Sequence, residues 1–250
     1  MTWISGIFKK NKKLPPFDLA SIGADMHSHL IPSIDDGAQS MDESIGMINK
    51  FKELGFKKII TTPHVMSDYY KNTPEIILGG IEKVKKELES LKIPVEINAA
   101  AEYYVDEFLL DKIKSNNILS FGNTKKYVLF EFSFTSEPLE KNNVIFQFLQ
   151  SGYTPVLAHF ERYMFFFSKP IEKAQDLKQR GVKIQVNLLS LTGHYGKKIQ
   201  EQAEILIDNK LVDFVGTDCH RMEHLETLEQ NLHLPYFHKL NELDLLNREL

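Results

Sequence analysis

Short apolar runs alternate along this chain with longer stretches whose apolar positions recur at helical spacing. Runs such as residues 58–61 and 127–130 are too short for helices, and their unbroken apolar character is typical of strands buried on both faces. Helical spacing covers residues 40–54, 71–91, 138–150, 170–180 and 196–209, and resumes from residue 221 to 250 with an interruption at Pro235. This alternation predicts an α/β protein with a parallel sheet.

Metal-binding residue types stand where the apolar runs end. In parallel α/β proteins the C-terminal ends of the strands meet on one face, which is where such proteins keep their chemistry. The candidate ligands at or just after six such endings are His27, His29, Asp36, His64, Glu102, Glu131, His159, Asp218 and His220. Their convergence predicts a metal centre.

The spacing of these endings predicts the number of strands. Most neighbouring endings are separated by roughly 30 residues or somewhat more, the size of one strand plus one helix. The step from His159 to Asp218 is about twice as long, so one strand without a ligand should lie between them, and residues 183–189 fit. We therefore expect a distorted seven-stranded (β/α)7 barrel, one strand short of the common eight.

Composition narrows the class of protein. A chain of 250 residues with 42% hydrophobic residues can bury one large core, and its formal charge of −4 indicates no nucleic-acid partner. The single cysteine excludes an internal disulfide and fits a reducing compartment. Because no apolar run reaches the roughly 20 residues that cross a bilayer, we expect a cytoplasmic protein.

Residues 1–20 are predicted to form a basic N-terminal extension to a single domain of residues 21–250 that ends in helices. Trp3, Ile4, Ile7 and Phe8 stand beside lysines, but the apolar part is too short for a signal peptide. A solvated tail is the favoured interpretation. The alternative is a peripheral contact with an anionic membrane surface.

The candidate ligands are weak signals singly and a strong one together. Asp36 precedes glycine and could merely form a turn, and His64 could be an ordinary surface histidine. Buried carboxylates such as Glu102 and Glu131 require a salt bridge or a shared cation. Imidazoles and carboxylates without thiolates suit manganese, iron or zinc, and nine ligands require two or three ions.

The motifs themselves resemble a known family. Asp25-Met26-His27-Ser28-His29, Asp35-Asp36-Gly37, Thr62-Pro63-His64, Ala101-Glu102-Tyr103-Tyr104 and Ala158-His159-Phe160-Glu161-Arg162-Tyr163 are similar to those of the polymerase and histidinol phosphatase (PHP) metallophosphoesterases. Within them the chain resembles the capsule-type, manganese-dependent bacterial protein-tyrosine phosphatases. Glu131 stands where histidinol phosphatases tend to carry histidine, which favours the tyrosine-phosphatase branch.

The resemblance implies three metals, manganese foremost, in a distorted seven-stranded barrel. It places His27, His29, Glu102 and Asp218 at one metal, Glu102, Glu131 and His159 at a second, and Asp36, His64 and His220 at a third. Arg162 matches the family arginine and is the predicted catalytic contact to phosphate. Lys71, Arg221 and His224 are further candidate phosphate contacts. Some relatives carry arginines after the residue matching His64, whereas this chain has Lys71.

These residues predict hydrolysis of phosphotyrosine monoesters by a metal-bridging hydroxide, without a covalent intermediate. The resemblance implies a protein substrate, a bacterial tyrosine kinase that controls capsular or exopolysaccharide synthesis. Cys219 lacks the loop of cysteine-dependent phosphatases and is predicted not to be a nucleophile. The alternatives are a small-molecule phosphatase, for example of histidinol phosphate, and a binding module without catalysis.

Aromatic residues near the motifs are candidates for the mouth of the site. Phe165, Phe166 and Phe167 could receive a phenyl ring, or could simply pack in the barrel wall. Four tyrosines, Tyr69, Tyr70, Tyr103 and Tyr104, are further candidates whose orientation the sequence leaves open.

Overall fold

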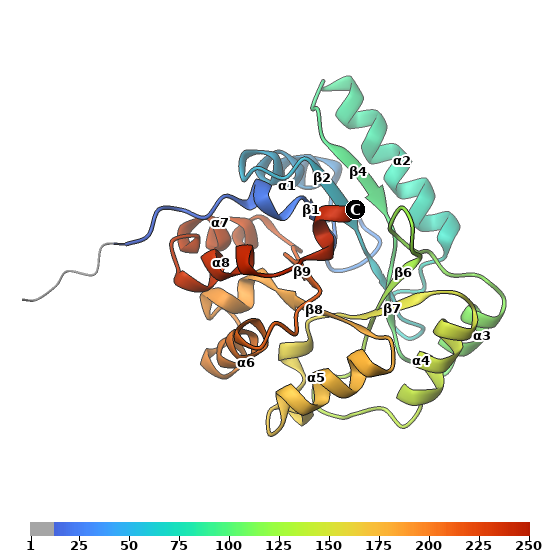
Figure 1. The fold of residues 1–250 in the computed structure, drawn as a ribbon. Helices are drawn as coiled ribbons and strands as arrows, with labels where there is room; N and C mark the ends of the chain where they lie inside the picture. Colours follow the sequence, from blue (N-terminus) through green and yellow to red (C-terminus); the bar gives the residue numbers. More distant parts are fainter. Residues whose placement is uncertain (1–12) are drawn as a thin grey trace, which may run out of the picture.

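A computed structural model describes residues 13–250 (Figure 1). The predicted solvated tail and its alternative, a membrane contact through Trp3, Ile4, Ile7 and Phe8, lie outside the described residues. Phe17 and Leu19 are buried, and the backbone N–H of Phe17 donates to Leu232 O at 2.9 Å, so the chain joins the folded body before residue 20. No helix in the described part is long and apolar enough to cross a membrane.

Short parallel strands form two sheets that curl around a common interior (Figure 1). One sheet has the order β1-β2-β4 and the other β3-β5-β6-β7-β8-β9. The strands are β1 (Ala24–Asp25), β2 (Lys58–Thr61), β3 (His64–Val65), β4 (Glu96–Ala99), β5 (Glu102–Tyr104), β6 (Tyr127–Glu131), β7 (Thr154–Leu157), β8 (Lys183–Asn187) and β9 (Phe214–Gly216). The predicted α/β class with a parallel sheet is confirmed.

Two of the predicted strands are interrupted. His64 and Glu102 were expected where strands end, yet each begins a second short strand, β3 or β5, and the two residues pair in register. Pro63 has no N–H to donate and so breaks the ladder between β2 and β3. The chain stays anchored there because the Thr62 N–H donates to Ser28 O at 2.7 Å.

The first and last strands meet at the end that carries the candidate ligands. A parallel bridge joins Ser28 to Cys219. The His29 N–H donates to Cys219 O, and the Asp218 N–H donates to His27 O, each at 2.8 Å. Segments nearly two hundred residues apart in the chain are thereby placed side by side.

Helices cover the outside of the curled sheets (Figure 1). They are α1 (Met41–Glu53), α2 (Pro74–Ser90), α3 (Leu109–Lys114), α4 (Lys141–Gln150), α5 (Pro170–Gln179), α6 (Lys197–Asp208), α7 (Met222–Asn231) and α8 (Pro235–Lys239). Short 3-10 helices span Leu19–Ile22, Phe160–Arg162, Met164–Phe166, Leu188–Thr192, Leu240–Glu242 and Leu246–Glu249.

The five helices predicted from apolar spacing are confirmed, with ends shifted by up to a few residues. In α1, for example, the Ser40 side chain accepts a hydrogen bond from the Glu43 N–H and so caps the helix, while Ile45, Ile48 and Phe51 face the core. The short α3 was not predicted. Beyond Arg221 the helical pattern yields only α7, α8 and 3-10 turns, and Pro235 begins α8.

The two ends of the curled sheets differ in chemistry. At the end opposite the candidate ligands, Leu246 and Leu250 pack against interior residues that include Met26 and Leu129. The buried Asn247 amide donates to Ala24 O at 2.9 Å and to Val215 O at 2.7 Å, and accepts from the Val215 N–H at 2.9 Å. The C-terminal segment thus closes this end with apolar side chains and satisfied hydrogen bonds.

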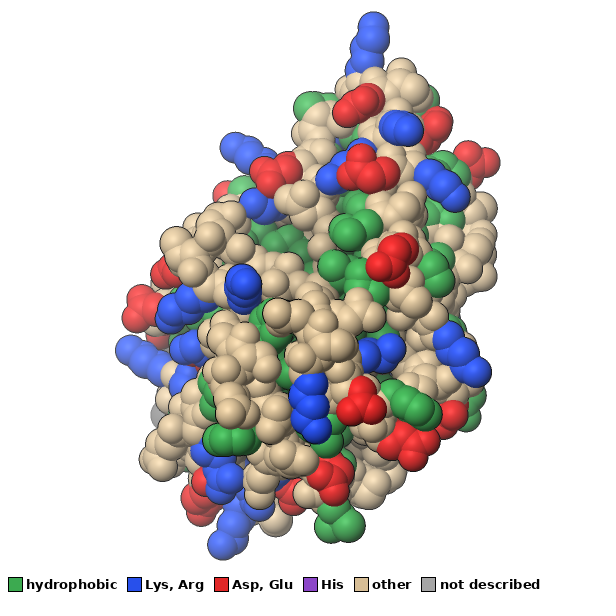
Figure 2. Space-filling view, turned by 90° about the vertical axis from the view of Figure 1, so that its right-hand side faces the viewer, with side chains coloured by type: hydrophobic (Ala, Val, Ile, Leu, Met, Phe, Trp, Pro, Cys, Tyr) green, Lys and Arg blue, Asp and Glu red, His purple; other side chains and the backbone are tan. Residues whose placement is uncertain are grey.

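Figure 2 shows the side of the molecule on which α2 and α3 lie. Hydrophobic side chains there stand among basic and acidic ones, and no histidine of the described chain is visible. The histidine cluster therefore does not open on this face.

Candidate metal centre

The nine predicted ligands all lie in one cluster at the C-terminal ends of the strands. Their side chains form four overlapping groups in which the candidate ligand atoms lie within 4.8 Å of one another. The groups are His29, Asp36, His64 and His220; His27, Glu102 and His159; His27, His29 and Asp218; and His64, Glu102 and Glu131. The structure brings together every residue of the predicted set.

His27 and His29 follow β1 and are both fully buried. Because they are two residues apart in extended chain, their rings point to the same side. His27 Nε2 lies 3.2 Å from Glu102 Oε2 and 3.3 Å from Asp218 Oδ1. His29 Nε2 lies 3.5 Å from each of the same two oxygens.

Glu102 lies at the centre of the cluster. Its Oε2 is 3.1 Å from His64 Nδ1, and its Oε1 is 3.0 Å from His159 Nε2. Glu131, at the end of β6, is 3.1 Å from His64 Nδ1 through Oε1 and 3.6 Å from His159 Nε2 through Oε2. Both oxygens of the Glu102 carboxylate thus lie close to histidines, which is the arrangement of a carboxylate that bridges two cations.

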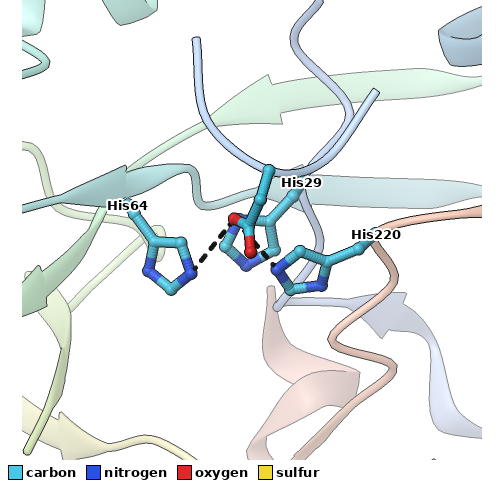
Figure 3. A group of neighbouring side chains, drawn as sticks. His29, His64 and His220 are labelled. Atoms are coloured by element: carbon cyan, nitrogen blue, oxygen red, sulfur yellow. Dashed lines mark ion pairs between the residues drawn. The ribbon is translucent and has the colours of Figure 1, made fainter. Parts of the chain in front are cut away.

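Asp36, His64 and His220 form the outer, partly exposed part of the cluster. Asp36 Oδ1 lies 3.6 Å from His64 Nε2 and 3.5 Å from His220 Nε2. Figure 3 shows the rings of His29, His64 and His220 converging, with those of His29 and His220 stacked at 3.9 Å between centroids. The acidic turn after the first motif therefore does more than reverse the chain.

The donor atoms fit divalent cations. His27 Nε2, His29 Nε2, His64 Nδ1 and Glu102 Oε2 are buried, and the three nitrogens lie within 3.5 Å of Glu102 Oε2, yet none of the four atoms makes a hydrogen bond of good geometry. A buried polar atom left without a hydrogen bond costs about 1–3 kcal/mol, and a cation bound between several such atoms would satisfy them together. Imidazole and carboxylate donors without thiolate are a normal set for such an ion.

The geometric groups differ in part from those that the resemblance implies. Asp36, His64 and His220 do group together, joined by His29. His159 groups with His27 and Glu102, whereas Glu131 groups with His64 and Glu102. The assignment of each residue to one of three ions stays a prediction.

Burial, hydrogen bonds and the charges of neighbouring groups together set the pKa values within the cluster. Burial opposes ionisation of Glu102, but the charges of His27 and His64 hold the pKa of its carboxyl well below the ordinary value. Burial likewise opposes protonation of His64, yet Glu102 raises its pKa to about 10. A hydrogen bond with His220, and then the charges of the neighbouring histidines, lower the pKa of Asp36 to about 2. The carboxyl groups of Glu102 and Asp36 are therefore ionised at neutral pH, which suits cation binding.

Two of the candidate ligands have strained backbones. His159 and Asp218 have φ of 33° and 53°, in the left-handed region that side chains other than glycine rarely adopt. Such conformations cost about 1–3 kcal/mol each and persist where the surrounding structure holds them, commonly at functional sites. The strain aims both side chains into the cluster.

Asp35 is a functional neighbour that the sequence reasoning did not assign. Its Oδ2 lies 2.7 Å from His29 Nδ1 and accepts the His64 N–H at 3.0 Å, while Oδ1 accepts the Gly37 N–H. A carboxylate behind a histidine fixes the ring and leaves the other nitrogen free for a ligand role. The adjacent acidic pair Asp35-Asp36 was the sequence signal that could have suggested this role. In the structure Asp35 contacts His29, whereas Asp36 faces His220.

Gln185 and Asn187 were also missed. They are fully buried on β8, in the run predicted as a strand without a ligand. Two polar residues that are two apart in an otherwise apolar strand face the same side. This pattern could have indicated that they point toward the site.

Arg162 lies at the edge of the cluster, held from several directions. Its Nη1 donates to Asp218 Oδ2 at 3.0 Å. The guanidinium carbon lies 4.2 Å from the centre of the Phe134 ring and 4.4 Å from that of Tyr195. Phe134 and Tyr195 belong to no motif, so the sequence offered no signal for this aromatic clamp.

A cavity of about 370 Å³ opens over the cluster. It is lined by Asp36, His64, Met66, Tyr70, Tyr104, Glu131, Phe132, Ser133, Phe134, His159, Arg162, Asp218 and His220. Its wall includes Tyr70, whose ring stacks on His64 with centroids 5.6 Å apart. One end is therefore anionic and rich in imidazole, and the walls are aromatic.

The other candidate phosphate contacts, Lys71, Arg221 and His224, lie outside this cavity. Lys71 lines a neighbouring cavity with Phe108, and Arg221 lines another with Asp42. His224 is buried, and its Nδ1 accepts the His220 N–H at 3.3 Å. None of the three lines the site cavity, so their predicted contact with phosphate stays a prediction.

The structure shows which of the aromatic candidates line the cavity and which pack in the core. Of the run at residues 165–167, the buried Phe166 stacks on Phe160 with centroids 4.7 Å apart, and none of the three lines the cavity. Tyr103 is buried in the core, whereas Tyr69 is exposed. Only Tyr70 and Tyr104 of the four tyrosines lie at the mouth.

Comparison with known proteins agrees with the motif resemblance. Residues 23–230 match the model of the family described as capsular polysaccharide synthesis, CpsB/CapC. The chain is 30% identical over 199 residues to the tyrosine-protein phosphatase YwqE of Bacillus subtilis, covering 80% of this chain and 78% of that protein. It is 28% identical over 204 residues to the tyrosine-protein phosphatase CpsB of Streptococcus agalactiae, covering 80% and 83%.

Solved structures are similar as well. One from a study of YwqE of Bacillus subtilis and CpsB of Streptococcus pneumoniae, described as unique metal-dependent tyrosine phosphatases, matches with a TM-score of 0.75 and 29% identity over 90% of this chain and 95% of that chain. An amidohydrolase of Mycoplasma synoviae shares the fold, with a TM-score of 0.58 and 12% identity over 96% and 91% of the two chains.

Proposed function

Because this chain belongs to the CpsB/CapC family of capsular polysaccharide synthesis, we propose that it is a metal-dependent protein-tyrosine phosphatase. The observation that carries the proposal is the complete cluster of nine histidines and carboxylates beneath one cavity, with Arg162 at its edge. A binding module without catalysis would have no need to keep every member of that cluster close together, six of them buried.

The cluster residues would hold two or three divalent ions, with manganese as the proposed metal and iron or zinc as alternatives. His27, His29, Glu102, Glu131, His159 and Asp218 would serve the inner ions, and Asp36, His64 and His220 an outer one. When bound, such ions neutralise phosphoryl oxygens and lower the pKa of a coordinated water.

The protein's own groups would bind and orient the substrate. Arg162 carries guanidinium N–H groups beyond the one bonded to Asp218, and these suit a phosphoryl group at the cavity. Tyr70 and Phe134 would flank the phenyl ring. Tyrosinate has a free pKa near 10, so it can depart without a strong general acid beside it.

The fold is proposed to be a distorted seven-stranded barrel. This interpretation counts β2 with β3, and β4 with β5, as single interrupted strands, and treats the Ser28–Cys219 bridge as the closure between the last strand and the first. We keep the single-domain division and the cytoplasmic location as part of the same proposal, with the N-terminal extension predicted for residues 1–20 shortened to end before the buried Phe17.

The physiological substrate is proposed to be a tyrosine-phosphorylated protein of capsular or exopolysaccharide synthesis, such as a bacterial tyrosine kinase. The family description and the names of the relatives support this assignment.

Hydrolysis of a phosphotyrosine peptide tests the activity. We expect phosphate release that requires added manganese and stops with chelator, and slower turnover of histidinol phosphate under the same conditions. Asp218→Ala should lose both metal and activity, whereas the exposed Asp244→Ala serves as a matched control and should keep both. Faster turnover of histidinol phosphate would favour a small-molecule phosphatase, and release unaffected by chelator would exclude the metal-dependent reaction.

A further inference from the structure

The strand predicted to lack a ligand, β8, is hydrogen-bonded to three of the site residues. Its side chains Gln185 and Asn187 are fully buried and face the same side. A continuous chain of hydrogen bonds runs from His27 through Gln185 and Asn187 to Asp218. Gln185 also bonds the backbone of His159.

The orientation of the Gln185 amide follows from its partners. The backbone N–H of His159 donates to the side chain at 2.7 Å, so the atom it meets must be the carbonyl oxygen Oε1. The amide nitrogen Nε2 then donates to Asn187 Oδ1 at 2.8 Å. Neither amide can be reversed without placing two donors or two acceptors against each other.

This orientation determines which nitrogen of His27 carries a hydrogen. His27 Nδ1 lies 3.2 Å from Gln185 Oε1, which can only accept, so Nδ1 must be the donor. The lone pair of the neutral ring is then on Nε2, the nitrogen that faces Glu102 and Asp218. A neutral imidazole with its second nitrogen held by an acceptor is the form that binds a metal ion.

The other end of the chain of hydrogen bonds orients Asp218. Asn187 Nδ2 donates to Asp218 Oδ2 at 2.8 Å, and Arg162 donates to the same oxygen. Oδ1 is left to face His27 and His29. The network therefore holds His159 and Asp218, the two candidate ligands whose backbones are left-handed.

We infer that Gln185 and Asn187 are positioning residues of the metal centre, which set the His27 tautomer and orient Asp218 and His159. This rests on the proposed function only in requiring that the cluster bind divalent metal. It assumes nothing about the substrate.

The tautomer can be measured on the unaltered protein. In the ¹⁵N-labelled chain loaded with zinc, which is diamagnetic, two-bond nitrogen–proton spectra should show His27 with its hydrogen on Nδ1, and His27→Gln assigns the signals. A hydrogen on Nε2 would overturn the inference.

Metal titration of variants provides the second test. Gln185→Leu removes the acceptor, and we expect manganese to bind about 10–100-fold more weakly by calorimetric titration. Gln185→Glu keeps an acceptor for His27 and His159 but loses the donor to Asn187, so it should keep the tautomer and lose only part of the affinity. Gln202→Leu, at a buried glutamine of α6, is the matched control and should bind as the parent does. Unchanged affinity in a folded Gln185→Leu would contradict the positioning role.

The two proposals fail in different ways. The positioning role is supported if the chain binds manganese, His27 carries its hydrogen on Nδ1, and Gln185→Leu lowers the manganese affinity. This holds even if phosphotyrosine is not hydrolysed. Conversely, an active phosphatase whose metal affinity is the same in Gln185→Leu and Gln202→Leu refutes the positioning role and leaves the activity standing.

Discussion

The guanidinium of Arg162 is sandwiched between two aromatic rings while one of its N–H groups is bonded to Asp218. A long flexible side chain normally loses about 1.5–2 kcal/mol of rotamer freedom when it is ordered. Because Phe134 and Tyr195 hold the group in the free protein, most of that loss precedes substrate binding. The arginine is preorganised for a planar, bidentate contact.

Tyrosine 195 offers a direct test of this preorganisation. Tyr195→Leu removes one ring of the clamp, and a partly desolvated cation–π contact contributes about 1 kcal/mol or somewhat more. We expect the inhibition constant of inorganic phosphate to rise by roughly five- to tenfold, since 1.4 kcal/mol corresponds to a factor of ten. Tyr195→Phe keeps the ring and should stay near the parent. Equal effects of the two substitutions would show that the hydroxyl, rather than the ring, matters.

Cysteine 219 stands between two candidate ligands yet faces away from them. Its Sγ lies 3.7 Å from Met47 Sδ, and burial raises the pKa of the thiol well above its ordinary value. A protonated, buried thiol is a poor nucleophile.

We therefore expect Cys219→Ala to retain phosphatase activity within about twofold and to unfold at slightly lower denaturant, by about 1 kcal/mol for the lost packing. The measurements are peptide turnover and a urea titration. Loss of turnover with the metal content unchanged would place the thiol in the reaction after all.

Adjacent glycines in α2 show how closely one helix packs against the rest of the fold. A Cβ at Gly79 would meet nothing within 4 Å, whereas one at Gly80 would lie 2.4 Å from Ile31 Cγ2. Ile31 follows the first histidine motif, so α2 packs closely against the chain that leads from the site.

The two substitutions to alanine should have opposite effects. Gly79→Ala should stabilise the fold by about 0.5–1 kcal/mol, because alanine is the better helix residue and loses less backbone entropy on folding. Gly80→Ala should destabilise it by about 1 kcal/mol or more through overpacking. Urea unfolding of both variants checks this, and stabilisation by Gly80→Ala would mean that α2 can move outward freely.

Apolar periodicity predicted most elements because burial dictates them. The candidate ligands at the strand ends could also be predicted to converge, because the C-terminal ends of parallel strands lie on one face. From the sequence, Pro63 predicted only that the preceding residue is extended, and not that the strand breaks after Thr62. The register that pairs His64 with Glu102 depends on contacts with the neighbouring strand. The Gln185–His27 hydrogen bond spans 158 residues, and only the folded packing brings its ends together.

At the scale of the whole molecule, metal binding should be coupled to stability. The cluster gathers carboxylates and imidazoles whose buried atoms lack partners, so a cation binds the folded chain in preference to the unfolded one. At a hundred times the dissociation constant such a ligand stabilises the fold by about 2.7 kcal/mol.

Thermal unfolding with and without chelator measures this coupling. For a chain of this size we expect chelator to lower the melting temperature by about 5–10 °C, and excess manganese to restore it. Asp218→Ala should show a smaller difference. Identical melting curves for the unaltered chain in chelator and in manganese would argue against a metal centre.

The end of the curled sheets opposite the cluster contributes to stability through Asn247. Asn247→Ala removes three hydrogen bonds to buried backbone groups of β1 and β9 and should cost about 2–4 kcal/mol. Asn241→Ala, which removes an exposed bond to Ser21, is the control and should cost less than about 0.5 kcal/mol. Calorimetric melting would separate the two; equal melting temperatures would mean that the C-terminal segment contributes little to stability.

The parallel bridge between Ser28 and Cys219 has a consequence for how the protein is made. His27 and His29 leave the ribosome nearly two hundred residues before Asp218 and His220. A nascent chain therefore holds only part of the donor set until Asp218 and His220 have been made. Metal capture would then follow the synthesis of these two residues, so that translation products truncated before them carry neither the bound ions nor the activity that depends on them.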